Sequence, residues 1–545
     1  MTHEHALKSL HNKITGKQWK RIGTVKRAGI LTPLSALRSS SSLGIGEIMD
    51  LKPLIDWCRV TGNSIIQLLP LNEMNHLDKS PYSALSVFAI DPLYVSLHGL
   101  DRFHLLPEIS DYITRNAREI ENLRNQERVN FNEVRRTKME LLRILFRDGY
   151  DKEAFSSYIE ANQYWIDDYA LFMVLKEKHE LKQWLQWQEP YKNRDTKALQ
   201  EFSETFKEEL LFYKFVQWIL FSQLQSVKLY GECHGIFLMG DLPILVSRDS
   251  ADVWAHQDYF DLKDTVGAPP DMYSTMGQKW GLPPYEWDNM KANGYDWWIA
   301  RLKYAEHFYH MFRLDHVIGF FRFYIVPEEA SDAVDGHYEP VDDTKWKEHG
   351  AELLKMIIEN TDMLVLGEDL GAVPPCTREI MEEFGIPGFK VERWERRYDK
   401  DSSYINPADF YPVSLSTLST HDSETVRGWW QNYPDERQVY YKTLGFDGTP
   451  PDTLEGLLEE TILKRIYSSA SVFTILGMWD ILGLNHGTLH DDPAQNRVNV
   501  PATVTPNNWT LRYRFDVQDM LGKNFVGFND KISNLIEESG RKVLN

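Results

Sequence analysis

Cysteine is scarce in this chain of 545 residues, which has three: Cys58, Cys233 and Cys376. Their odd number and wide spacing give no disulfide framework and no pair of closely spaced metal ligands. We therefore expect each thiol to be a small buried hydrophobe rather than part of a disulfide or a metal site.

Long apolar runs and an excess of positive charge are also missing. No stretch approaches the roughly 18 apolar residues of a membrane helix. Residues 1–23 are polar and basic, without the apolar centre of a signal peptide. Lys and Arg number 60 against 80 Asp and Glu, a net charge of −20 that repels phosphate groups. We expect a cytoplasmic protein with no membrane or nucleic-acid partner; the sequence does not determine the oligomeric state.

Aromatic residues, by contrast, are plentiful, at 13% of the chain with 17 Trp and 26 Tyr. Aromatic side chains fill large cores and also offer flat faces to sugar rings. Composition alone leaves both uses open.

One sequence pattern recurs along the chain, although no internal repeat or low-complexity segment is found. It is a short apolar run, rich in β-forming residues, that ends in a polar or acidic residue or a loop. Eight segments have it: 28–34, 64–70, 235–241, 312–315, 363–369, 388–392, 414–422 and 472–480. Such runs are typical of buried parallel strands. Because helical patterns lie between several of them, we predict an α/β fold, a (β/α)8 TIM-type barrel. An open doubly wound sheet fits the same alternation less well.

Three long segments interrupt the alternation. Residues 104–230 are charged and helical, and we interpret them as an inserted helical subdomain between the second and third strands. We predict an N-terminal extension (1–27), a first part of the barrel (28–103), this insertion, and the rest of the barrel (231–545). Two irregular segments in the last part are expected to lie at the mouth of the barrel. They are a lid loop (264–288) and a late loop (485–508).

Four acids close four of the runs: Asp241, Asp315, Glu368 and Asp422. The carboxyl ends of barrel strands face one mouth, so these carboxylates are expected to converge in one cleft. A single buried acid is usually a cap or an ion-pair partner, but four on different strands favour chemistry. Glycosyl transfer needs such a set, and in its retaining form a nucleophile and a proton donor lie about 5–5.5 Å apart. Arg313, two residues before Asp315, is expected to keep that nucleophile ionised.

An acid cluster also suggests a metal site. Its candidate ligands are His310, Asp315, His316, His421 and Asp422. Metal-dependent barrel hydrolases usually need a His pair on an early strand, and the first strand here, AGILTPL, has none. We therefore expect no metal and no cofactor.

Several segments together resemble the 4-α-glucanotransferases of the amylomaltase, or disproportionating enzyme, family (glycoside hydrolase family 77, in the α-amylase clan). The resemblance covers about residues 29–509. The motifs that carry it are GILTPLSAL with GIGE, LLPL, SPYSALSVFAIDP, GDLPI with VWAH, GQKWGLPPYEWD, FRLDHVIGFF, GEDLG, GIPGFKV and STHD.

The resemblance implies a role for each matching residue. Asp315 in RLDH would be the nucleophile, Glu368 in GEDLG the general acid/base, and Asp422 in STHD the third acid that binds sugar hydroxyls. Arg313 and His421 match supporting positions. The implied sugar-binding residues are Tyr82, Asp241, Gln278, Trp280 and Asn499.

The chain also departs from the family pattern. His421-Asp422 is followed by Ser423-Glu424 where HDND is frequent, and VNVPA (498–502) stands for a Met-Asn-x-Pro-Gly pattern. The second run has Ile where an aromatic residue is common. The N-terminal starch-binding extension of some plant relatives is missing. These changes bear on donor and acceptor preference and on the balance of transfer and hydrolysis.

We therefore predict a 4-α-glucanotransferase that moves α-1,4-glucan segments from a donor maltooligosaccharide to the 4-hydroxyl of an acceptor, through a covalent glucosyl-enzyme. An amylase-like hydrolase with the same residues and a non-catalytic glucan-binding barrel are the alternatives. The expected partner is an α-glucan.

Overall fold

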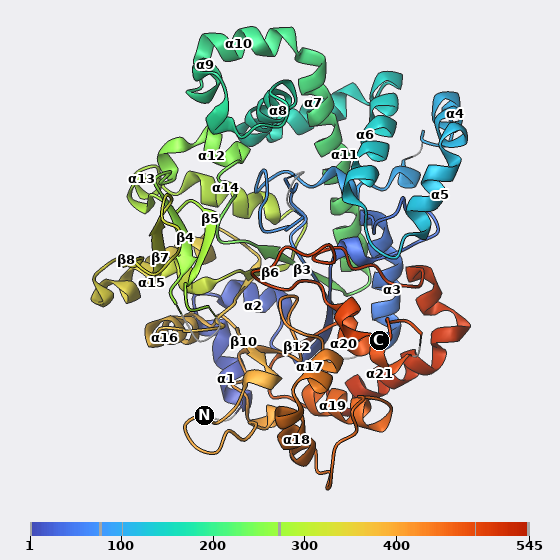
Figure 1. Ribbon diagram of the computed structural model, residues 1–545, viewed down its shortest axis with the longest axis vertical. Coiled ribbons are helices and arrows are strands. Elements are labelled where there is room, and N and C mark those ends of the chain that lie inside the picture. Colours follow the sequence, from blue (N-terminus) through green and yellow to red (C-terminus); the bar gives the residue numbers. More distant parts are fainter. Residues whose placement is uncertain (1–2, 76–78, 101, 271–273, 486, 542–545) are drawn as a thin grey trace.

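Eight short parallel strands form the centre of the molecule (Figure 1). The computed structural model describes residues 3–75, 79–100, 102–270, 274–485 and 487–541. Each predicted run contributes one strand. The strands are β1 (Arg27–Thr32), β2 (Ile65–Leu68), β3 (Phe237–Leu242), β6 (Met311–Leu314), β9 (Leu364–Gly367), β10 (Gly388–Val391), β11 (Ser414–Thr417) and β12 (Phe473–Gly477).

The sheet is a nearly closed barrel. Its strand order is β10-β11-β12-β1-β2-β3-β6-β9, which follows the order of the chain around a circle. The two end strands meet where the amide of Gly367 donates to the carbonyl of Pro387 at 3.0 Å. An open doubly wound sheet would reverse its strand order at a switch point, and this sheet does not. The (β/α)8 barrel is confirmed.

The strands form where the sequence is apolar because both of their faces are covered. All residues of β1, β2 and β9 are buried. Side chains fill the inside of the barrel and helices cover the outside, so the strands lack the alternation of half-exposed sheets. α3 (Leu51–Thr61) shows how a helix leads back into the barrel. It is followed by Gly62 in the left-handed conformation, φ 82°, which ends the helix shortly before β2 begins.

Helices surround the barrel. They are α1 (His3–Ser9), α2 (Gly16–Ile22), α3, α11 (Lys207–Cys233), α12 (Ala251–Ala255), α13 (Trp287–Ala292), α14 (Asp296–Ala305), α15 (Trp346–Glu359), α16 (Pro375–Phe384), α17 (Val426–Asn432), α18 (Pro434–Thr443), α19 (Leu457–Tyr467), α20 (Met478–Ile481) and α21 (Val526–Glu538). Trp19 of α2 is fully buried and stacks on Phe473 of β12 at 5.7 Å, so residues before β1 belong to the packed core.

The segment 104–230 is helical, as the sequence predicts. It contains α4 (Pro107–Arg115), α5 (Ala117–Asn125), α6 (Phe131–Asp148), α7 (Lys152–Ala161), α8 (Gln163–Lys178), α9 (Glu189–Lys192), α10 (Thr196–Thr205) and most of α11. These helices lie along one side of the barrel (Figure 1). The apolar stripe of α11 is buried throughout, from Leu210 to Val227, so it belongs to the core.

The prediction of an irregular lid loop over 264–288 is wrong in its secondary structure. The segment contains β4 (Asp264–Ala268) and β5 (Gln278–Leu282), which pair antiparallel. With β7 (Phe323–Pro327) and β8 (His337–Glu339) they form a second sheet in the order β5-β4-β7-β8. The Gly and Pro residues that indicate a loop lie largely between and after the strands. Residues 271–273 lie outside the described residues.

The late loop keeps its irregular character. Apart from a short 3-10 turn, Pro493–Asn496, it has no helix or strand among its described residues; residue 486 lies outside them. The cysteines differ from expectation, because Cys58 is buried but Cys376 is partly exposed and Cys233 is exposed. Within the described residues, no helix is long and apolar enough to cross a bilayer.

Candidate active site

Three of the four predicted acids lie at the same end of neighbouring strands. Leu314 of β6 is level with Gly367 of β9, so the next residues, Asp315 and Glu368, leave the sheet side by side. Asp241 lies in β3, on the other side of β6. Because the carboxyl ends of barrel strands share one mouth, the three carboxylates converge as predicted.

The fourth acid reaches the site from a loop rather than from a strand end. The sequence predicts Asp422 at the end of a strand, but β11 ends at Thr417, and Asp422 lies on the loop that follows. The Ser423 hydroxyl accepts a hydrogen bond from the amide of Thr420 at 2.9 Å. Such local bonds favour a turn over a strand, which explains why the strand is shorter than its run.

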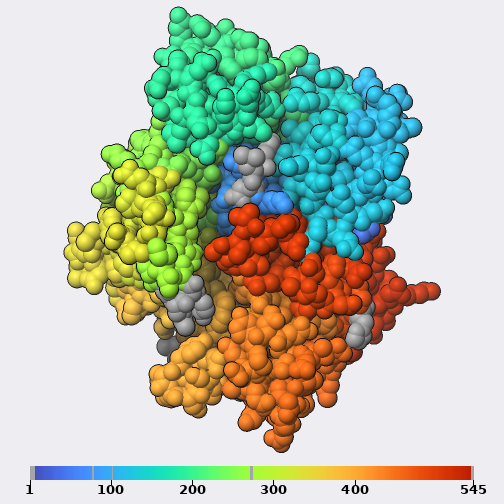
Figure 2. Space-filling model, in the orientation of Figure 1, coloured from blue at the N-terminus to red at the C-terminus, as the bar shows by residue number. Residues whose placement is uncertain are grey.

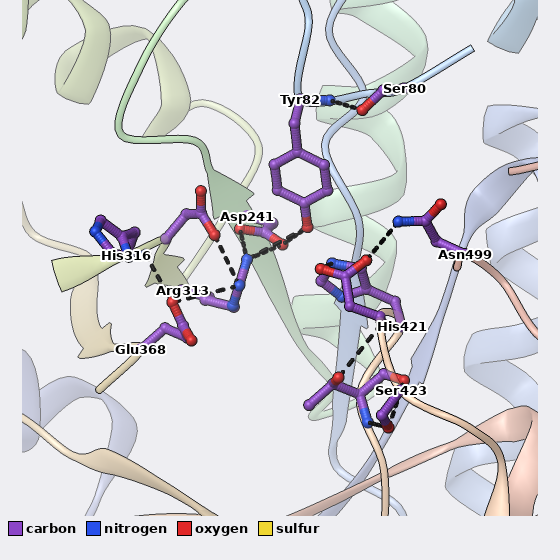
Figure 3. A network of polar contacts seen from close by, with 12 residues as sticks. Ser80, Tyr82, Asp241, Arg313, His316, Glu368, His421, Ser423 and Asn499 are labelled. Atoms are coloured by element: carbon purple, nitrogen blue, oxygen red, sulfur yellow. Dashed lines mark hydrogen bonds and ion pairs between the residues drawn. The ribbon is translucent and has the colours of Figure 1, made fainter. Parts of the chain in front are cut away.

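The buried guanidinium of Arg313 joins the carboxylates (Figure 3). Its Nη1 lies 2.8 Å from both oxygens of Asp241, and its Nη2 lies 2.8 Å from Oδ1 of Asp315 and 3.8 Å from Oε2 of Glu368. Burial lowers the pKa of Arg313, but Asp241 and Asp315 outweigh burial and raise this pKa well above its usual value. The guanidinium is therefore always charged, and its contact at 2.8 Å fixes the Asp315 carboxylate in place.

Glu368 has a different electrostatic setting. Burial raises its pKa to about 8; the charge of Arg313 opposes this shift and that of Asp315 adds to it. The amide of His316 donates to Oε2 of Glu368 at 2.8 Å and orients the carboxyl group. His316 has a left-handed backbone, φ 45°, which turns this amide toward Glu368. A carboxyl group with this pKa keeps its proton at neutral pH and can donate it.

One nitrogen limits the distance between Asp315 and Glu368. Both carboxylates contact Nη2 of Arg313, so their nearest oxygens are no further apart than the sum of the two contact distances. A carboxyl group with a raised pKa, Glu368, therefore lies beside a second carboxyl group that pairs with Arg313. Two carboxyl groups at such a short separation are typical of an acid and a nucleophile in glycosyl transfer.

Two neighbouring side chains hold the carboxylate of Asp422. Asn499 donates to Oδ1 at 2.7 Å, and Nε2 of His421 lies 3.2 Å from Oδ2. Burial raises the pKa of Asp422, but His421, Asn499 and Arg313 outweigh burial and lower this pKa below its usual value. The side chain is 45% exposed toward the open cleft. Asp422 is thus a fixed anion that a ligand can reach.

Tyr82 lies above this cluster as part of a small aromatic group. Its ring stacks on His421 at 5.3 Å with an interplanar angle of 13°, and Trp509 packs against both rings at 5.8 Å. The Tyr82 hydroxyl donates to Oδ2 of Asp241 at 2.8 Å. Tyr82 thus links the group to Asp241, and its hydroxyl also accepts a hydrogen bond from Nη1 of Arg313 at 3.3 Å.

Gln278 and Trp280 approach the site from β5. The indole Nε1 of Trp280 donates to Gln278 at 3.2 Å, and its ring meets the edge of the His316 ring at 5.2 Å. Because the amide of His316 binds Glu368, the second sheet contacts the residue that orients the proton donor. The structure therefore brings all ten predicted site residues to one mouth of the barrel.

A cleft of about 920 Å³ lies over this mouth. Gln278 of β5 and Pro501 of the late loop both line it, together with Arg313, Glu368 and Asp422. Figure 2 shows this face of the molecule, with the red late loop opposite the green segment that leads into the second sheet. A volume of this size can hold more than one sugar ring.

The sequence missed three aromatic residues of the site. Trp509 packs on Tyr82 and His421, while Trp394 and Tyr398 line the cleft and are 39% and 65% exposed. Because they are exposed within the cleft, their rings offer flat apolar faces to a ligand there. Their only sequence signal is the abundance of aromatic residues, which cannot separate a core ring from a cleft ring.

The candidate metal ligands do not form one set. His310 precedes β6, at the opposite end of the barrel from Asp315. Its ring accepts from the amide of Leu238 and contacts Glu232, both at 3.0 Å. Within the described ranges, no group of three or more His, Cys, Asp or Glu side chains is placed to hold a metal ion. Ion pairs with Arg313 and hydrogen bonds account for the acids instead.

Comparisons with known proteins all point to the same family. A family model described as 4-alpha-glucanotransferase matches residues 32–518. The 4-alpha-glucanotransferases of Chlamydia pneumoniae and Chlamydia caviae are each 35% identical to the chain. The matches cover 97% and 98% of this chain and 99% of each relative.

A solved structure agrees over the same length. The amylomaltase of Streptococcus agalactiae, in complex with acarbose, superposes with a TM-score of 0.79 at 25% identity, and the match covers 95% of this chain and all of that one. The resemblance found in the motifs is confirmed: with its barrel, its converging acids and its relatives along nearly the whole length, the chain belongs to the 4-alpha-glucanotransferase family.

Proposed function

We propose that this protein transfers α-1,4-glucan segments between maltooligosaccharides with retention of configuration, with Asp315 as nucleophile and Glu368 as general acid/base. The observation that carries these roles is the shared contact with Arg313, which places Asp315, in an ion pair at 2.8 Å, beside Glu368, whose pKa burial raises to about 8. The family name describes the activity, and the proposal assigns that activity to particular residues.

The first step cleaves the donor. Glu368 gives its proton to the glycosidic oxygen while a carboxylate oxygen of Asp315 attacks the anomeric carbon. The bond from that carbon to the leaving oxygen breaks, and an ester bond to Asp315 forms. Arg313 orients the Asp315 carboxylate through their ion pair, and the glucan chain beyond the leaving oxygen departs with a free 4-hydroxyl group.

The second step reverses the roles. The ionised Glu368 takes the proton of the acceptor 4-hydroxyl, whose oxygen attacks the anomeric carbon and releases Asp315. Asp422, a fixed anion open to the cleft, binds hydroxyl groups of the sugar ring as it flattens. Hydrogen bonds that strengthen in the transition state raise the rate of both steps.

Transfer requires that an acceptor sugar outcompete water. The cleft extends beyond the acids and carries exposed aromatic side chains, Trp394 and Tyr398, on which sugar rings can stack. Gln278 and Trp280 approach from the second sheet. Acarbose, an analogue of a short glucan, is bound in the amylomaltase of Streptococcus agalactiae, which supports a maltooligosaccharide as ligand here.

Incubation with maltotriose alone tests the proposal. We expect glucose together with a ladder of longer maltooligosaccharides, because segments pass from one molecule to another. An amylase-like hydrolase would give only shorter sugars. Asp315→Asn and Glu368→Gln should each lower the rate at least about a thousandfold, since one carries the covalent step and the other the proton.

The matched control is Glu379→Gln, which makes the same chemical change at an exposed acid of α16 that pairs with Lys347. It should leave the rate unchanged. A non-catalytic glucan-binding barrel predicts that all three variants behave alike, and full activity in Asp315→Asn would refute the assignment of the nucleophile.

A further inference from the structure

The loop that carries Asp422 is held at both ends by one buried carboxylate. This catalytic loop spans residues 418–425, between β11 and α17. Ser419, near its start, donates its hydroxyl proton to Oδ2 of Asp480 at 2.5 Å. Val426, just past its end, donates its amide proton to Oδ1 of Asp480 at 2.8 Å. Asp480 is 1% exposed and does not line the cleft.

The local structure around Asp480 is built to make these contacts. Asp480 belongs to α20, which begins directly after β12, so the barrel fixes its position. The indole Nε1 of its neighbour Trp479 donates to the Ser419 hydroxyl at 2.8 Å. Gly477 allows this, because a Cβ at that position would lie 2.3 Å from the Trp479 ring. Ser419 thus accepts a hydrogen bond from Trp479 of α20 and donates one to the next residue, Asp480.

These hydrogen bonds set the separation of the loop ends. A carboxylate is an acceptor with two oxygens, and here each oxygen takes one donor from a different end of the loop. Both hydrogen bonds are shielded from water, because Asp480 is 1% exposed, and leaving a buried donor without a partner is costly. Between the two anchors the chain has only one turn, closed by Thr420 and Ser423.

The tip of the loop is the part that faces the substrate. His421 stacks on Tyr82, and Asp422 accepts from Asn499 (Figure 3). The amide of Asn499 also donates to the carbonyl of His421 at 3.1 Å. A shift of the anchors would therefore move Asp422 relative to Asp315, whose position the barrel strands and Arg313 fix separately.

We propose that Asp480 is a positioning residue for the transfer reaction. It acts through Ser419 and Val426 to hold the catalytic loop, and so Asp422, at the distance from Asp315 that the transition state requires. The inference rests on the proposed role of Asp422 in binding the distorted sugar ring. Asp480 has no contact with the substrate in this mechanism.

The test uses Asp480→Asn, which keeps the shape and the acceptor for Val426 but replaces the acceptor for Ser419 with a donor. We expect kcat for maltotriose to fall about 10- to 100-fold while KM changes less than about threefold, because a displacement on the order of 1 Å affects the transition state most.

Asp50→Asn is the matched control. Asp50 is also a buried carboxylate, 4% exposed, that accepts a backbone amide, from Glu47, and it lies outside the cleft lining. Its kcat should equal that of the wild type.

A double-variant cycle separates positioning from general stability. Ser419→Ala removes the hydroxyl that donates to Asp480. Adding Asp480→Asn to this variant should therefore lower kcat by a smaller factor than Asp480→Asn does in the wild type. A purely structural role predicts that kcat follows the loss of thermal stability equally in Asp480→Asn and Asp50→Asn. Wild-type kcat in folded Asp480→Asn would overturn the inference.

If Asp480→Asn does not fold, Ser419→Ala alone decides: a kcat about tenfold lower, at unchanged KM, supports the inference, and a wild-type kcat overturns it. Failure of the proposed function is visible separately, since it would appear as activity in Asp315→Asn whatever happens at position 480.

Discussion

At the scale of single residues, burial raises the pKa of Asp241 and of Glu368, and the charge of Arg313 opposes both shifts. Arg313 contacts Asp241 and Asp315 at 2.8 Å but Glu368 at 3.8 Å, so the charge acts most weakly on Glu368. Burial then raises the pKa of Glu368 to about 8. Residue types alone predicted a nucleophile and a proton donor. The raised pKa of Glu368 and its longer distance from Arg313 identify it as the proton donor.

The first prediction is a loss of activity at alkaline pH. Glu368 must carry a proton to start the reaction, and its pKa of about 8 means that the protonated fraction falls as pH rises through 8. We expect kcat/KM for maltotriose to decline tenfold per pH unit above that value, since kcat/KM reports the free enzyme. A kcat/KM that is constant from pH 6 to pH 9 would contradict this assignment.

The second prediction concerns stability. Because the pKa of Glu368 is higher in the folded protein than in the unfolded chain, its contribution to stability is complete below about pH 4 and is lost as pH rises toward 8. Glu368→Gln cannot ionise and avoids this loss. We expect its melting temperature to match that of the wild type at pH 4 and to exceed it by a few degrees at pH 8, on the order expected for such a change. Scanning calorimetry at both values measures the difference.

At the scale of elements, the β4–β5 pair positions Gln278 beside the cleft. Gly267 of β4 lies so close to β5 that a Cβ there would be 2.0 Å from the carbonyl oxygen of Gln278. This closeness is a backbone contact, which cannot be relieved by rotating a side chain. The second sheet therefore tolerates only glycine at this position.

The third prediction follows. Gly267→Ala should push β5 away from β4 and lower kcat/KM about tenfold or more, because it displaces Gln278 and Trp280. The control is Gly527→Ala in α21, where a Cβ would meet nothing within 4 Å. In a helix this change should be neutral or stabilising by up to ~1 kcal/mol, with unchanged activity. Equal activity in the two variants would show that β5 does not contribute to the site.

At the scale of the whole molecule, buried ion pairs join the helical segment 104–230 to the barrel. Arg135 of α6 lies 2.9 Å from Asp91 and 3.4 Å from Glu73, and all three side chains are buried or nearly so. Tyr169 of α8 donates to the same Glu73. We propose on this basis that the segment is a subdomain that folds together with the barrel rather than alone.

The fourth prediction uses two adjacent arginines of α6. Arg135→Met leaves two buried carboxylates without their cation, and we expect it to lower the free energy of unfolding by about 3–5 kcal/mol. Arg136→Met removes only exposed pairs with Glu119, Glu133 and Glu140, so its cost should be about 0–1 kcal/mol. Urea denaturation followed by fluorescence measures both, and equal losses would contradict the proposed role of Arg135.

Two errors show what sequence reasoning lacks. Residues 264–288 read as a loop because Gly and Pro mark turns, yet β4 forms there by pairing with β5 and with β7, which lies about 60 residues further along the chain. The strand of the run 414–422 ends at Thr417, because the hydrogen bond between Thr420 and Ser423 favours a turn before Asp422. The first error arises from pairing between distant segments, and the second from a side-chain hydrogen bond that the apolar pattern does not show.

The sequence by itself determined the barrel and the identity of its acids. Apolar runs buried on both faces have few alternatives to parallel strands, and the parallel arrangement brings strand ends to one mouth. The tertiary structure alone decided which carboxyl group keeps a proton, where Asp422 stands, and that Asp480 anchors its loop. Those properties depend on distances of a few ångströms between residues that lie tens to hundreds of positions apart, because both electrostatic shifts and hydrogen bonds are set by such distances.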